Sequence, residues 1–170
     1  MRRVLPGYQK FGPSPPTGKA HHGNEGSDLA PRTQRVVQVQ KMRVLLADDH
    51  RRLLEVTRGL LEPTFDVVEC VEDGESLVEA AGRLQPDIIV TDISMPKLNG
   101  IEAADRLRES GSPSKIVFLT AHVDPDFVQA ALKTGALAYV TKFRINTDLS
   151  VAIGEALAGH IFVSPLESTV

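Results

Sequence analysis

The sequence predicts an α/β domain built on a doubly wound parallel sheet, and two patterns in the chain lead to this prediction. From Val44 onward, short apolar runs alternate five times with longer amphipathic segments, as in successive β-α units. The central runs are continuously apolar, which is expected of strands covered by helices on both faces of a sheet. We therefore expect five parallel strands and five helices.

The expected elements alternate strictly along the chain. The strands are predicted at residues 44–47, 66–70, 87–91, 115–120 and 138–141. The helices are predicted at residues 50–61, 74–84, 100–110, 125–134 and 146–158. Gly111, Gly135 and Gly159 lie just beyond three of these helices, where a left-handed C-cap is favoured. The last helix carries one apolar stripe at helical spacing, which predicts that one face is buried.

The chain divides into three parts by composition. Residues 1–41 contain five prolines, five glycines and no sustained apolar period, so we predict a disordered N-terminal extension. This part holds seven basic against two acidic residues, but it lacks the interleaved aromatic residues of a nucleic-acid-binding element. Residues 42–161 form the predicted domain, and residues 162–170 form a short C-terminal tail.

The compartment and the single cysteine are also informative. No apolar run approaches the ~20 residues of a membrane helix, and Met1-Arg2-Arg3 is not followed by a signal-peptide stretch. We therefore expect a cytoplasmic protein that does not associate with a membrane. Cys70 has no partner for an internal disulfide, and its apolar neighbours predict a buried strand position without chemistry.

Polar residues end four of the predicted strands. The first strand ends at Asp48-Asp49, the third at Asp92, the fourth at Thr120 and the fifth just before Lys142. Because loops at the carboxyl ends of parallel strands face one crevice, these side chains should meet in space. Each alone has an ordinary explanation, such as a helix cap, a strand end or a surface amine. Their convergence favours a functional site.

The chemistry of this set points to a metal and a phosphoryl group. Clustered carboxylates repel one another unless a cation joins them, and hard oxygen ligands suit Mg²⁺, with Mn²⁺ as the alternative. Asp92 could then act as an oxygen nucleophile that forms an aspartyl phosphate, with Lys142 neutralising charge and Thr120 binding a phosphoryl oxygen.

Several segments of the sequence resemble the receiver domains of two-component response regulators over nearly all of residues 42–161. Val44-Leu-Leu-Ala-Asp-Asp-His50 is similar to the first strand and acidic pair of that family. Asp92-Ile-Ser-Met-Pro-Lys-Leu-Asn-Gly100 is similar to its phosphoacceptor loop. Thr120-Ala121 and Lys142 match as well. The resemblance implies a flavodoxin-like fold with strand order 2-1-3-4-5.

The resemblance assigns roles to individual residues. Asp92 is the implied phosphoacceptor, and the metal ligands are Asp48, Asp49, Asp92 and the backbone carbonyl of Ser94. Thr120 and Lys142 are the implied contacts of the phosphoryl group. No turnover of a separate substrate is expected, only self-phosphorylation of Asp92 from a phosphodonor and autodephosphorylation.

Two pairs of residues concern switching and lifetime. In the family, the counterparts of Thr120 and Tyr139 move together on phosphorylation, although Tyr139 could instead be a half-buried strand aromatic with its hydroxyl in water. Ser94 and His122 flank the path of the attacking water in the family and are implied to tune phosphoryl lifetime; ordinary loop polarity is the alternative.

Two residues beside the predicted site, Phe143 and His50, need separate comment. Phe143 follows Lys142 where many receivers have proline, which leaves the geometry of that loop open. His50 completes an Asp-Asp-His run, but we do not expect zinc there, because no second histidine lies at ligand spacing.

The expected function is a stand-alone receiver of a phosphorelay. A histidine kinase or phosphotransfer protein would donate the phosphoryl group, an unknown downstream protein would bind the altered face, and a homodimer is an option. The Asp-Asp-His opening, Gly100-Ile-Glu-Ala-Ala104 and Ala158-Gly-His-Ile-Phe-Val-Ser-Pro165 resemble the LuxR/NarL branch, which usually adds a helix-turn-helix domain. Only five residues follow Pro165, so direct DNA binding by this chain is not expected.

Two alternatives stay open at this point, and a third is disfavoured. The chain could be a phosphorylation-independent interaction or dimerising module, or a fragment of a LuxR/NarL-type transcriptional regulator. A metal-dependent phosphatase acting on small esters is disfavoured, because it requires an acid two residues after the nucleophile and Ser94 is there.

Overall fold

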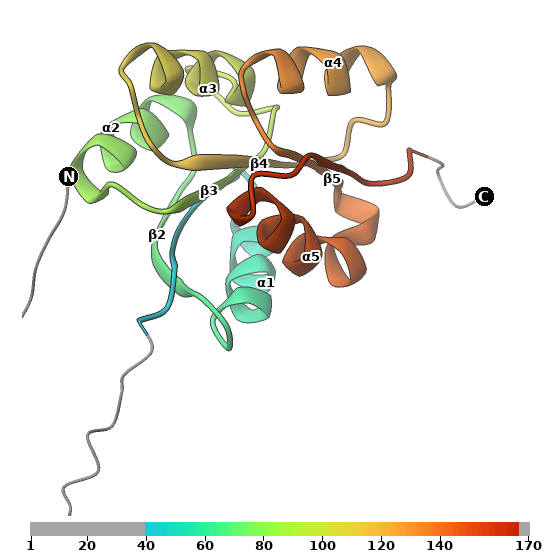
Figure 1. Ribbon diagram of the computed structural model, residues 1–170. Coiled ribbons are helices and arrows are strands. Elements are labelled where there is room, and N and C mark those ends of the chain that lie inside the picture. The colour runs from blue at the N-terminus through green and yellow to red at the C-terminus, as the bar shows by residue number, and fades with distance from the viewer. Residues whose placement is uncertain (1–39, 167–170) are drawn as a thin grey trace, which may run out of the picture. The chain divides into compact units, whose positions relative to one another are not determined.

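The computed structural model describes residues 40–166 and confirms the predicted doubly wound α/β fold (Figure 1). The strands are β1 (Arg43–Ala47), β2 (Asp66–Val71), β3 (Ile88–Thr91), β4 (Lys115–Thr120), β5 (Ala138–Thr141) and β6 (Phe162–Val163). The helices are α1 (Arg51–Leu61), α2 (Gly74–Leu84), α3 (Gly100–Glu109), α4 (Pro125–Lys133) and α5 (Ile145–Leu157), with a 3-10 turn at Lys142–Arg144. The prediction of a disordered segment at residues 1–41 falls almost entirely outside the described residues.

The sheet has the order β2-β1-β3-β4-β5-β6, and each adjacent pair is parallel. The predicted order of the first five strands is therefore confirmed. β6 is an addition, because residues 162–163 were expected in a tail. Its pairing is explained by the free backbone groups on the open edge of β5: Phe162 N donates to Leu137 O at 2.9 Å and Ser164 N donates to Tyr139 O at 2.8 Å.

Helices cover both faces of the sheet, with α1 and α5 on one face and α2, α3 and α4 on the other (Figure 1). Side chains of β1 alternate between these layers. Val44 and Leu46 pack in the layer that contains α1 and α5, whereas Leu45 and Ala47 pack in the opposite layer. All four are buried, which explains why the strand sequence is continuously apolar.

Capping side chains set where three helices begin. Asp73 accepts a hydrogen bond from Ser76 N at the start of α2, and Asp124 accepts one from Asp126 N at the start of α4. Asn99 and Glu102 form a reciprocal capping box at α3. The three glycines predicted to follow helices all have positive φ, as expected. These local signals place the helix starts beside the carboxyl ends of the strands.

Two further expectations are tested by the structure. Cys70 lies on β2 as predicted, but it is partly rather than fully buried, because β2 is an edge strand paired only with β1. Across residues 40–166, none of the helices has the length and apolar character needed to span a membrane.

Candidate functional site

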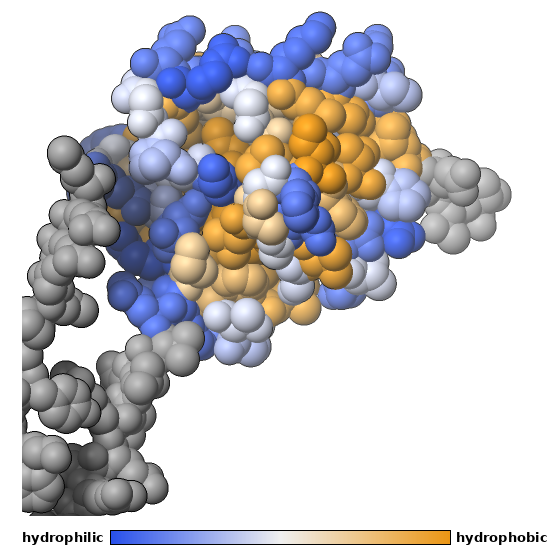
Figure 2. Space-filling view, in the orientation of Figure 1, coloured by the Kyte–Doolittle hydropathy of each residue, from blue (hydrophilic) through white to orange (hydrophobic). Residues whose placement is uncertain are grey.

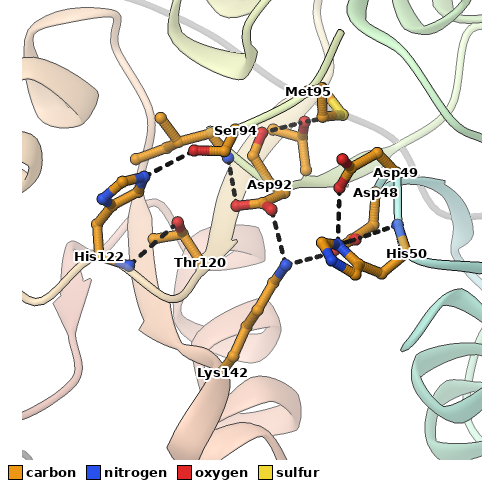
Figure 3. Close-up of polar contacts among 11 residues, drawn as sticks. Asp48, Asp49, His50, Asp92, Ser94, Met95, Thr120, His122 and Lys142 are labelled. Atoms are coloured by element: carbon orange, nitrogen blue, oxygen red, sulfur yellow. Dashed lines mark hydrogen bonds and ion pairs between the residues drawn. The ribbon is translucent and has the colours of Figure 1, made fainter. Parts of the chain in front are cut away.

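Four strands deliver the predicted polar residues to one crevice at their carboxyl ends (Figure 3). Asp48 directly follows β1 and Asp92 directly follows β3. Thr120 is the last residue of β4, and Lys142 directly follows β5. Asp48, Asp92 and Lys142, which are far apart in the sequence, are in contact here as predicted, and Thr120 lies near them.

Lys142 joins two of the carboxylates. Its Nζ lies 2.7 Å from Asp48 Oδ2 and 2.7 Å from Asp92 Oδ2. Both aspartates are buried, at 4% and 3% exposure. Burial alone would lower the pKa of Lys142, but its contacts with Asp48 and Asp92 outweigh that effect, so the pKa is raised above its ordinary value. Lys142 therefore carries its positive charge in this crevice.

One ammonium does not fully compensate the acidic group. Among the described residues, none donates a hydrogen bond to Asp48 Oδ2, which lies 2.7 Å from Lys142 Nζ in an ion pair. Asp49 lies beside it with a side chain that is 36% exposed. Asp48, Asp49 and His50 present three ligand atoms within 4.8 Å of one another. A buried, under-satisfied carboxylate oxygen beside a second carboxylate fits a hard divalent cation.

The loop after β3 holds Asp92 in a fixed direction. Asp92 N donates to Ala47 O at 2.9 Å, and its Oδ1 accepts from Ile93 N at 2.6 Å, so Oδ2 is left to face Lys142. Gly100 closes the loop by donating from its N to Ile93 O at 2.8 Å. A Cβ at Gly100 would lie 1.9 Å from Asp92 O, so only glycine permits this close approach.

His122 connects the loop after β4 to the loop after β3. Its Nε2 lies 2.8 Å from Ser94 Oγ in a hydrogen bond, and its ring stacks on Phe127 with a centroid distance of 4.0 Å. The backbone N of His122 donates a long hydrogen bond of 3.4 Å to Oγ1 of Thr120, which is fully buried. The two residues predicted to flank the site thus contact each other directly.

Tyr139 is fully buried, and its hydroxyl donates to His122 O at 3.0 Å. The alternative of a half-buried aromatic with its hydroxyl in water is therefore wrong. Burial is the main reason that the pKa of Tyr139 is raised to about 12, with further contributions from the negative charges of Asp92 and Asp124. The hydroxyl stays protonated and ties β5 to the loop after β4.

The structure also shows what the sequence left undecided or missed. Phe143 is 72% exposed within the 3-10 turn after β5, and Lys142 still reaches the aspartates without a following proline. His50 was left out of the site by sequence reasoning, yet its imidazole faces Asp49 and Asp48. The adjacent run Asp-Asp-His was the available signal. Phe127 was also missed, because nothing local in the sequence links it to His122.

Comparison with known proteins gives a consistent result. A family model described as "Response regulator receiver domain" matches residues 44–153. The chain is 36% identical over 131 residues to the transcriptional regulatory protein DegU of Brevibacillus brevis, covering 76% of this chain and 56% of that protein. It is 37% identical over 123 residues to the nitrate/nitrite response regulator protein NarL of Escherichia coli strain K12, covering 71% and 57%.

A solved structure agrees with these relatives. The crystal structure of a two-component response regulator of the LuxR family from Aurantimonas sp. SI85-9A1 aligns with a TM-score of 0.70 and 34% identity. The alignment covers 74% of this chain and 91% of that one. The chain spans a little over half the length of DegU and NarL. With its fold, its crevice and these matches in agreement, the chain belongs to the response regulator receiver domain family, with relatives of the LuxR/NarL type.

Proposed function

We propose that this domain is a phosphorylation-controlled switch that accepts a phosphoryl group on Asp92 from a histidine kinase or a phosphotransfer protein. The observation that carries the proposal is the position of the Asp92 carboxylate. It is buried at the carboxyl end of the sheet, with Oδ1 held by its own loop and Oδ2 2.7 Å from Lys142. This arrangement orients an oxygen nucleophile beside a fixed positive charge.

The crevice suits a divalent ion, Mg²⁺ or Mn²⁺. Asp48, Asp49, Asp92 and the backbone carbonyl of Ser94 would hold it, directly or through water. The ion would neutralise charge that develops on the transferred phosphoryl oxygens. The under-satisfied Oδ2 of Asp48 supports this assignment, because a cation supplies the compensation that Lys142 alone does not give.

The chain's own residues divide the transfer between them. An oxygen of Asp92 forms the new bond to phosphorus as the bond from phosphorus to the donor's leaving atom breaks. Lys142 lies 2.7 Å from both Asp48 and Asp92. Its ammonium would pair with an oxygen of the phosphoryl group on Asp92. Thr120 Oγ1 would donate its hydrogen to another phosphoryl oxygen. The same groups serve autodephosphorylation, and no separate substrate is required.

The switch proposal follows from how Thr120 and Tyr139 meet at His122. Within residues 40–166, Thr120 Oγ1 accepts a single hydrogen bond, at 3.4 Å from His122 N, whereas Tyr139 OH donates to the carbonyl of His122. A phosphoryl group that draws Thr120 inward would break the weaker contact and displace the loop. Tyr139, bonded to that loop, would follow. The hydrogen bond between Ser94 and His122 lies beside Asp92 (Figure 3), which supports a role for both residues in phosphoryl lifetime.

The altered face would bind a downstream protein or a second copy of the chain. In Figure 2, hydrophobic residues gather below α4, over β6 and α5, whereas the outer sides of α3 and α4 are hydrophilic. The exposed large hydrophobic residues of this part of the chain include Val151, Ile161 and Val163. This apolar surface adjoins β5, which carries Tyr139. The cytoplasmic location and action without an attached DNA-binding domain stay predictions.

Intact-mass spectrometry after incubation with Mg²⁺ and acetyl phosphate tests the proposal. We expect a phosphoryl adduct in the wild type and none in Asp92→Asn or in the presence of EDTA. A folded, Mg²⁺-binding wild type that gives no adduct would contradict the proposal and favour a phosphorylation-independent interaction module.

A further inference from the structure

His50 is placed where its imidazole can serve the crevice instead of its own helix. It is the N-cap residue of α1, but its side chain makes no capping hydrogen bond. Its Nδ1 lies 2.8 Å from Asp49 Oδ1 and 3.3 Å from Asp48 Oδ1. The ring is 72% exposed, so burial does not force it into this position. The imidazole therefore faces Asp48 and Asp49, the carboxylates that would bind the proposed metal.

The spacing of these atoms matches adjacent ligands of one ion. In an octahedral site with bonds of about 2.1 Å, neighbouring ligand atoms lie about 3 Å apart. The two distances from His50 Nδ1 bracket that value, and all three ligand atoms lie within 4.8 Å of one another. His50 N also donates to Asp48 Oδ1 at 2.8 Å. The turn from β1 into α1 thus holds the imidazole and Asp48 together as one unit.

A second observation concerns Asp48, whose two oxygens face His50 and Lys142. Asp48 is only 4% exposed, and among the described residues none donates a hydrogen bond to its Oδ2. In Figure 3, Asp48 lies between Lys142 and His50, so its two oxygens face opposite sides of the crevice. Carboxylate oxygens of Asp48 and Asp49 beside an imidazole nitrogen make a ligand set of mixed type.

We propose that His50 Nδ1 is an additional ligand of the divalent ion in this crevice, and that it shifts the site's preference from Mg²⁺ toward transition ions such as Mn²⁺ and Ni²⁺. The inference rests on the proposed metal site. Mg²⁺ demands oxygen ligands, whereas imidazole binds first-row transition ions with an affinity that rises from Mn²⁺ to Ni²⁺. Loss of the imidazole should therefore weaken Ni²⁺ binding much more than Mg²⁺ binding.

His50→Asn is the variant that isolates the imidazole. Asparagine is a favourable N-cap residue, so α1 keeps its start while the metal-binding nitrogen is removed. His160→Asn is the matched control. His160 is an exposed histidine that follows α5 in the sequence, whereas the crevice residues precede α5. Its Nδ1 lies 2.9 Å from Glu155 Oε2. It reproduces a histidine–carboxylate pair without the second aspartate.

The direct test is pulsed electron paramagnetic resonance of full-length protein loaded with one equivalent of Mn²⁺. Nitrogen-14 modulation from a bound imidazole should be present in the wild type and in His160→Asn, and absent in His50→Asn. In calorimetric titrations, His50→Asn should lower Ni²⁺ affinity roughly tenfold and change Mg²⁺ affinity less than about threefold.

The outcomes separate this inference from the metal site itself. Bound Mn²⁺ without nitrogen modulation in the wild type, or modulation that survives in His50→Asn, would overturn the role of His50 and leave the metal site intact. Equal losses of Ni²⁺ and Mg²⁺ affinity would also overturn it, because they would reflect a structural effect. If no divalent ion binds the wild type, the proposed metal site fails together with the inference.

Discussion

Two sites in the structure contain buried carboxylates, and these carboxylates are satisfied very differently. Asp148, in the first turn of α5, accepts from Arg144 at 2.7 and 3.2 Å, from Thr147 Oγ1 at 2.7 Å and from Ser164 Oγ at 2.7 Å. Asp48 and Asp92 share one lysine, and Asp48 Oδ2 accepts no hydrogen bond from residues 40–166.

The difference distinguishes a site that stabilises the fold from the site that we propose for phosphoryl transfer. The hydrogen bonds of Asp148, with that from Arg144 the strongest influence, lower its pKa to about 2 despite its burial. Asp148 also holds Ser164 and so fixes the segment that follows β6. The crevice instead keeps two buried carboxylates with little compensation, which costs stability and leaves room for a cation and a phosphoryl group.

The largest expected effect on stability is at Asp148. Asp148→Ala leaves Arg144, Thr147 and Ser164 without their shared acceptor, so we expect the free energy of unfolding to fall by about 3 kcal/mol. Urea denaturation followed by circular dichroism measures this loss. Asp92→Asn should cost far less, since it relieves a carboxylate cluster. Equal losses in the two variants would remove the contrast between the sites.

Metal should stabilise the crevice and leave the Asp148 site unaffected. Mg²⁺ at about 100 times its dissociation constant should raise the free energy of unfolding by about 2.7 kcal/mol, because it binds only the folded state. Ser164→Ala, which disturbs only the other site, should show the same rise. Denaturation curves with Mg²⁺ and with EDTA give the comparison. A wild type that is indifferent to Mg²⁺ would count against the metal site.

Acid should remove the stabilisation that the hydrogen-bonded carboxylates of Asp148 and Asp73 provide. The folded-state pKa values of Asp148 and of Asp73, which caps α2 through Ser76 N and contacts Lys97, are both about 2, below the ordinary value of 3.8. Both groups therefore stabilise the fold at neutral pH, and this stabilisation is lost as pH falls from about 4 to about 2. Stability measured across this range should fall less steeply in a folded Asp148→Asn variant. An unchanged slope would contradict the assignment.

Ser164→Ala removes a single buried hydrogen bond to Asp148 and should cost about 1 kcal/mol of unfolding free energy. It should also loosen β6, since Ser164 N donates to Tyr139 O. Amide hydrogen exchange at Phe162 and Ser164 reports this loosening. Unchanged protection there would show that the backbone pairing does not depend on the side-chain contact.

Ser94→Ala removes a serine hydrogen bond in the crevice and should barely change stability, by less than about 0.5 kcal/mol, because Ser94 is exposed. Its effect should be kinetic. Loss of the bond to His122 should change the rate of autodephosphorylation roughly fivefold, the equivalent of about 1 kcal/mol. His122→Ala should produce a change of the same sign, and the double variant should add little. Additive changes would separate the two residues.

The contrast between the sites also explains how far sequence reasoning reached. The strands and the meeting of Asp48, Asp92, Thr120 and Lys142 were predictable, because apolar runs and strand-end positions are local signals with a fixed consequence in a parallel sheet. The short strand β6 was not, since two residues carry no periodicity and its pairing depends on the free edge of β5.

Contacts between distant loops could not be predicted from the sequence either, because they depend on how the folded chain places those loops. Ser94 and His122 were each singled out, but their hydrogen bond depends on the relative heights of two loops. The hydrogen bond from Ser164 to Asp148 forms only when β6 pairs with β5. The direction of the His50 ring depends on a side-chain rotamer, which neighbouring residues in the sequence do not determine.

The most direct test of the central claim is to locate the phosphoryl group after Mg²⁺ and acetyl phosphate treatment, by peptide-level mass spectrometry of the wild type, Ser164→Ala and Asp92→Asn. We predict a single adduct on Asp92 in the wild type and in Ser164→Ala, and none in Asp92→Asn. An adduct on another residue, or one that persists in Asp92→Asn, would contradict the claim that the under-compensated crevice is built for phosphoryl transfer to Asp92.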